Sequence, residues 1–167
     1  LQVIEDLLLA YQGEGSKRDE WFNGALGILK GIAIRFFKDY PQQCTIPHIV
    51  NFACSAGAER ILGFVEATHE SRMLASAFVD SKGSERTQAS YLSSLTNYLS
   101  PLAFNKNICY VLSGNDFQFN LIDPECPKIL SVANSYQIEN VISPVIALMV
   151  SISSRRFTMK NEIPFFY

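Results

Sequence analysis

Residues 21–37 read WFNGALGILKGIAIRFF and form the longest apolar stretch of the 167-residue chain. The apolar side chains recur at the three- and four-residue spacing of one helix face, which predicts a long helix capped by Ser16 or Asp19. The stretch approaches the length of a membrane span, but Lys30 and Arg35 would each be expensive in hydrocarbon. We therefore predict that it is the core helix of a globular domain.

Three glycines, Gly24, Gly27 and Gly31, interrupt this helix. Each weakens helix propensity by about 1 kcal/mol relative to alanine, so their presence needs a compensating reason. We expect them to permit close approach of a neighbouring helix.

Helical periodicity continues on both sides of the core helix. The expected helices are Leu1–Tyr11, one after Thr45 with Pro47 in its first turn, segments through Ile61–Val65 and Met73–Phe78, and one after Ser84 with a stripe ending at Leu102. Capping residues open two of these helices, and the connections are short. The pattern predicts an all-helical bundle over about residues 1–105.

The hydrophobic period changes after residue 105. Ile108–Leu112 and Lys128–Ala133 are short apolar runs bounded by Asn, Gly or Pro, as expected of buried strands. Helical periodicity returns over Val141–Ile152, and Ile163–Tyr167 again has strand character. Strand, helix and strand in this order predict a parallel βαβ unit over 106–167, so the expected fold is mainly α with a partial parallel α/β piece.

Composition excludes several classes of protein. The chain is 48% hydrophobic and 18% charged, which argues against disorder. Fourteen basic and sixteen acidic residues give a net charge of −2, so the chain should not coat nucleic acid through its overall field. The four cysteines lack C-x-x-C spacing, which favours reduced thiols and a cytoplasmic setting.

Two groups of polar residues are candidates for contact with DNA phosphates. The first is the set of core-helix cations, Lys30, Arg35 and Lys38; the second is the polar face of the helix after Ser84, with Arg86, Gln88, Ser90 and Asn97. The alternatives are cations at the rim of a core helix that keep their charged ends in water, and a polar face that is merely solvated.

Catalytic motifs give no positive signal. Gly13–Lys17 lacks the spacing of a phosphate-binding loop and follows a helix where that motif needs a strand. Glu66 and His69 stand three residues apart, as metal ligands on one helix can, but a di-metal site needs a second such pair. A small metalloenzyme therefore ranks below a solvated polar face, and we expect no catalytic and no metal-binding residues.

Several short motifs follow one another in a defined order. An acidic residue and an aromatic pair, Asp19 with Trp21 and Phe22, open the core helix, and residues 84–90 read SERTQAS before a later helix. Residues 113–117 read SGNDF, and residues 127–132 read PKILSV ahead of the helix and the last strand. This order resembles the middle of a TraG-like type IV coupling protein, the conjugation ATPase that hands relaxase-bound DNA to a type IV secretion channel.

The resemblance implies a fold and a setting for this chain. Residues 1–105 resemble the family's all-α substrate-recognition domain, and residues 106–167 resemble part of its RecA-like nucleotide-binding domain up to the Walker B strand. It implies a parent that is a homohexamer anchored at the cytoplasmic face of the bacterial inner membrane, using ATP and Mg²⁺, with DNA, relaxase or relaxosome proteins as partners.

The same resemblance limits what this chain does alone. The Walker A loop, the Walker B acids and the membrane helices of the family have no counterpart here, so we expect no ATP hydrolysis, no cofactor and no membrane segment in this piece. Both ends look cut, and we expect a segment of a larger protein. The alternative from a different class is a helical adaptor that binds only another protein through exposed Phe and Tyr.

Overall fold

The computed structural model describes residues 1–12, 18–114, 125, 129, 131 and 139–159, with side chains up to Ser154. Every regular element in these ranges is a helix, as the predicted mainly α fold requires. In chain order they are α1 (Gln2–Gln12), α2 (Glu20–Asp39), η1 (Pro41–Gln43), α3 (Ile46–Ser55), α4 (Ala58–Glu66), α5 (His69–Leu74), α6 (Ser76–Asp80), η2 (Ser81–Gly83), α7 (Glu85–Ala103), α8 (Lys106–Ser113) and α9 (Glu139–Met159).

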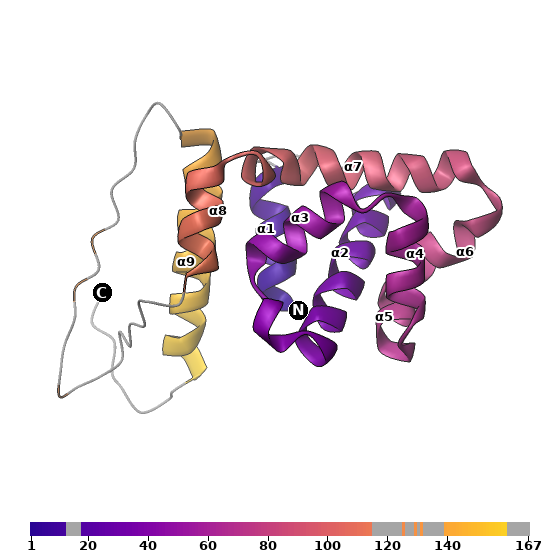
Figure 1. The fold of residues 1–167 in the computed structure, drawn as a ribbon. Coiled ribbons are helices and arrows are strands. Elements are labelled where there is room, and N and C mark those ends of the chain that lie inside the picture. Colours follow the sequence, from indigo (N-terminus) through magenta and orange to yellow (C-terminus); the bar gives the residue numbers. More distant parts are fainter. Residues whose placement is uncertain (13–17, 115–124, 126–128, 130, 132–138, 160–167) are drawn as a thin grey trace.

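Helix α2 is the centre of the bundle, as predicted from its apolar stretch. It contacts α1, α3, α4, α5, α6 and α7, and Figure 1 shows it between α1 on one side and α4 and α5 on the other. Phe22, Ile28, Leu29 and Ile32 on α2 are fully buried. Within the described ranges, no helix is long and apolar enough to cross a membrane.

The α2 glycines lie where neighbouring chain segments approach most closely. A Cβ at Gly27 would lie 2.6 Å from the backbone oxygen of Leu74, and a Cβ at Gly24 would collide with the ring of Tyr91. Real Cβ atoms do not come so close to a backbone oxygen, because van der Waals repulsion rises steeply there. The prediction that these glycines permit close packing is confirmed.

The predicted caps are also confirmed. The carboxylate of Asp19 accepts a 2.8 Å hydrogen bond from the backbone N–H of Phe22, whereas Ser16 lies outside the described residues. Thr45 and Ser84 cap α3 and α7 in the same way. These side chains satisfy backbone donors that the first helical turn leaves free.

Residues 108–112 are not a strand, contrary to prediction; they form most of α8. Asn105 caps this helix, its side-chain oxygen accepting a 3.1 Å hydrogen bond from the N–H of Ile108. Ile108 and Leu112, one turn apart, pack against the core, while Tyr110 on the opposite face is 83% exposed. A run of five apolar residues fits both the helical and the strand period. The N-terminal cap at Asn105 favours the helix.

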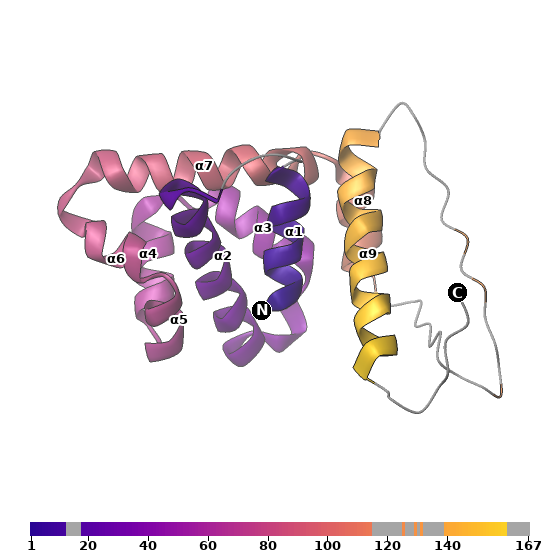
Figure 2. The same ribbon diagram turned by 180° about the vertical axis from the view of Figure 1, so that it is seen from behind.

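The helix predicted over 141–152 is confirmed as α9, which begins two residues earlier at Glu139. It packs beside α1 at one end of the bundle, with Leu148 buried in the core (Figure 2). Of residues 128–133 only Ile129 and Ser131 are described, neither in a helix or strand, and 163–167 lie outside the described residues. The βαβ unit predicted over 106–167 is therefore not shown, and the described helices of that range pack on the bundle.

Candidate interaction surface

Lys30 points from α2 toward α1 and is neutralised there. Its Nζ lies 2.6 Å from the carboxylate of Glu5, and Arg18 reaches the same carboxylate at 3.2 Å. The hydrogen bond from Lys30, helped by the charges of Lys30 and Arg18, lowers the pKa of Glu5 below its ordinary 4.5 although burial opposes this. The side chain of Lys30 is only 21% exposed, so it belongs to the α1–α2 packing.

Arg35 lies on another side of α2, against α4. Its guanidinium is 2.6 Å from the carboxylate of Asp39 one turn later and 5.3 Å from the centre of the Phe64 ring. A cation above an aromatic face and beside a carboxylate is stabilised by both. With 15% of the side chain exposed, Arg35 holds α2 against α4 and offers little charge to an outside phosphate.

Lys38 pairs with Glu70 of α5, and this hydrogen bond is the main reason why the pKa of Glu70 lies below its ordinary value. The three core-helix cations therefore face α1, α4 and α5 in turn. The structure does not bring them together, and each has an acidic partner. Lys30 and Arg35 are also largely buried, so of the three only Lys38, with 41% of its side chain exposed, is open to a phosphate.

The polar face of α7 divides into buried and exposed members. Gln88 is buried and donates from Nε2 to the backbone oxygen of Phe78 at 3.5 Å. Ser90 Oγ is satisfied by the backbone oxygen of Arg86 at 2.9 Å. Arg86 and Asn97 are exposed. Of the four residues predicted on this face, these two are thus placed for contact with a partner.

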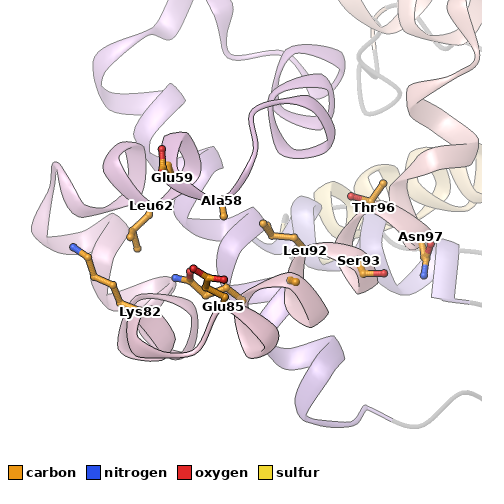
Figure 3. Close-up of a pocket in the computed structure, with 11 residues that line it drawn as sticks. Ala58, Glu59, Leu62, Lys82, Glu85, Leu92, Ser93, Thr96 and Asn97 are labelled. Atoms are coloured by element: carbon orange, nitrogen blue, oxygen red, sulfur yellow. The ribbon is translucent and has the colours of Figure 1, made fainter.

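A groove of about 810 Å³ lies between α4 and α7. We call it the α4–α7 groove; its residues include Ala58, Glu59 and Leu62 of α4, Lys82 of η2, and Glu85, Leu92 and Asn97 of α7 (Figure 3). The sequence predicted a helical segment through Ile61–Val65 and a helix after Ser84, but it did not predict a groove between them. Periodicity shows which face of each helix is apolar but not where two such faces diverge, so no signal in the sequence marks the groove.

Glu66 and His69 are not on one helix, contrary to the expectation from their spacing. Glu66 ends α4 and His69 begins α5, and the Glu66 carboxylate is 3.6 Å from Lys82 Nζ. Among the side chains that the structure describes, no three His, Cys, Asp or Glu are grouped as a metal site requires.

The described cysteines are Cys44, Cys54 and Cys109, all free thiols, and Cys126 lies outside the described residues. Burial raises the pKa of Cys54 to about 11 and also raises the pKa of Cys44 and of Cys109. A thiol that stays protonated at neutral pH is a poor nucleophile.

Comparison of the chain with protein-family models, with curated proteins and with solved structures gives no match.

Proposed function

We propose that this chain is the substrate-recognition part of a TraG-like conjugative coupling ATPase, which delivers relaxase-bound DNA to a type IV secretion channel. The observation that carries the proposal is the order of the family's motifs along the chain. Two of them fall on helix starts that the structure describes: Asp19 with Trp21 and Phe22 opens the central helix α2, and SERTQAS over 84–90 caps and begins α7.

The position of α8 is compatible with this assignment. In the family, the chain re-enters the nucleotide-binding domain at the segment that SGNDF over 113–117 resembles. Helix α8 ends at Ser113, where that segment begins, and it packs on α3 and α7. The helical bundle therefore continues beyond residue 105, because α8 packs on α3 and α7 and α9 packs on α1 with Leu148 in the core. In this proposal the parent is a membrane-anchored hexamer that uses ATP and Mg²⁺.

The charge distribution favours a protein as the recognised partner over bare DNA. Lys30, Arg35 and Lys38 are each paired with a carboxylate, and the chain carries a net charge of −2. Protein–DNA interfaces are much more positively charged than protein–protein interfaces. We infer that the helical domain recognises a relaxase or an accessory protein of the relaxosome.

The second candidate is a helical adaptor with no role in conjugation. Phe104 at the end of α7 and Tyr110 on α8 are 80% and 83% exposed, and large exposed aromatic side chains are enriched in protein interfaces. Both candidates predict a protein partner. Only the coupling protein requires nucleotide-binding motifs in the parent chain.

The gene that encodes this chain distinguishes the two candidates. We expect its reading frame to carry G-x-x-x-x-G-K-[ST] upstream of Leu1 and an acidic pair directly after Tyr167, because the family's phosphate loop and Walker B acids occupy those places. A parent protein with both motifs that hydrolyses ATP supports the proposal. A complete reading frame that lacks both motifs contradicts it and leaves the adaptor.

A further inference from the structure

The α4–α7 groove has apolar walls that the core does not use fully. Leu62 on α4 and Leu92 on α7 are half-buried, and Ala89 on α7 is exposed beside them. Figure 3 shows Leu62 on α4 and Leu92 on α7, which both line the groove. Small side chains at Ala58 and Ala89 leave room between these leucines, so an apolar side chain of a partner could be buried there.

The groove is long as well as apolar. Along α7 its lining extends from Glu85 to Asn97, which at 1.5 Å per helical residue is about 18 Å. That length corresponds to about 12 residues of a helix laid alongside. A groove of this shape suits an elongated peptide segment better than a compact small molecule. Amphipathic helices bind in grooves of this kind.

The rim of the groove is acidic. Glu59 and Glu85 are exposed at its edge, and the cation beside them, Lys82, is already 3.6 Å from the Glu66 carboxylate. The lining therefore carries two carboxylates, Glu59 and Glu85, against one ammonium group, which already has a carboxylate partner. A partner that carries Lys or Arg next to its apolar residues would match this potential, and one that carries Asp or Glu would be repelled.

We propose that the α4–α7 groove binds a basic amphipathic helix of a partner protein, with apolar side chains between Leu62 and Leu92 and cations at Glu59 and Glu85. The inference rests on the proposed function in one respect: the helix would belong to a relaxase or a relaxosome accessory protein. The recognition chemistry is the same for any parent.

The test is selection from a library of random helical peptides displayed on phage, with the purified chain as bait. We expect the recovered peptides to carry Leu, Ile or Phe at i, i+3 or i+4 and i+7, with at least two Lys or Arg beside them. A recovered peptide is then synthesised with a fluorophore, and its Kd is measured by anisotropy. Affinity should fall as salt rises, because salt screens exposed charges.

Variants locate the binding site. Glu59→Lys with Glu85→Lys should weaken binding at least tenfold, and Ser93→Trp, at an exposed position in the lining, should abolish it by filling the groove. Glu20→Lys is the matched control, because Glu20 is the first residue of α2 just as Glu85 is the first of α7, and it lies outside the groove lining. Circular dichroism confirms that each variant stays helical.

Several outcomes overturn the proposal. They are acidic or uncharged consensus peptides, no enrichment over an unrelated bait, and affinity that Glu20→Lys lowers as much as the groove variants do. Self-association that Ser93→Trp abolishes would identify a second copy of this chain as the occupant instead. None of these results bears on whether the reading frame carries nucleotide-binding motifs. The groove proposal can therefore fail while the proposed function stands.

Discussion

The hydroxyl of Ser71 on α5 donates a 2.7 Å hydrogen bond to the backbone oxygen of Gly31 on α2, and the Ser71 side chain is fully buried. At the same crossing, a Cβ on Gly31 would lie 2.9 Å from the backbone oxygen of Ser71. The two helices therefore meet backbone to backbone. The buried hydroxyl is satisfied only while Gly31 stays small.

We expect Gly31→Ala to destabilise the fold by about 1–3 kcal/mol, because the added methyl must push backbone apart in a packed core. The control is Gly63→Ala on α4, where a Cβ would meet no atom within 4 Å. That change should stabilise by about 0.5–1 kcal/mol through helix propensity. Urea denaturation of both variants measures the difference. Equal stabilisation by the two alanines would contradict the close approach of α2 and α5.

The ion pair of Glu5 with Lys30 leads to a prediction about how the stability of the fold depends on pH. Its pKa is lowered in the folded protein, chiefly by the hydrogen bond from Lys30, so the folded state favours the carboxylate more than the unfolded state does. The resulting stabilisation is present above the ordinary pKa of 4.5 and is lost as pH falls through the lowered folded value. We expect Glu5→Gln to cost about 1 kcal/mol at neutral pH, in the range of a partly exposed ion pair.

The measurement is the free energy of unfolding of both proteins from pH 7 downward. The curves of the native chain and Glu5→Gln should converge in acid. Glu59→Gln, at an exposed carboxylate on α4, controls for loss of one negative charge. Parallel curves for the native chain and Glu5→Gln down to strongly acidic pH would mean that the Lys30 pair adds no stability.

Tyr11 on α1 forms a hydrogen bond that links α1 to α9. Its hydroxyl donates a 3.0 Å hydrogen bond to the backbone oxygen of Val141, and burial raises its pKa to about 12. Tyr11→Phe removes this bond, and we expect a loss of about 1 kcal/mol. Hydrogen exchange should accelerate in α9 and stay unchanged in α2, since local opening begins at weakly held elements. Unchanged exchange in α9 would show that apolar contacts such as Leu148 suffice.

Much of the bundle was predictable because its signals are local. Asp19, Thr45 and Ser84 each precede an apolar-periodic run, and a cap needs only its own first turn. The strand predicted at residues 108–112 was wrong because five apolar residues carry no period of their own. Asn105 in front of them was the better signal, since its side chain caps α8.

The candidate site was less predictable because it depends on distant partners. Lys30 is neutralised by Glu5, 25 residues away, and Lys38 by Glu70, 32 residues away. The sequence shows a row of cations on α2 but not the acids that α1 and α5 bring to them. The α4–α7 groove is a property of two helices that diverge, which neither helix encodes alone.

The pairing of the α2 cations leads to a prediction about DNA. Binding that neutralises phosphates releases counterions, and the logarithm of affinity falls with the logarithm of salt by about 0.9 for each phosphate. Since Lys30, Arg35 and Lys38 already hold carboxylates, we expect the chain to bind a short duplex weakly, with a slope that corresponds to about one or two phosphates.

Arg86→Glu removes an exposed cation on α7 and should lower the remaining affinity only about twofold to threefold, because one exposed charge contributes little. Anisotropy titrations at several salt concentrations give both quantities. A slope of about five phosphates or more, with binding lost in Arg86→Glu, would identify a DNA interface around α7 and refute the inference that this domain reads a protein.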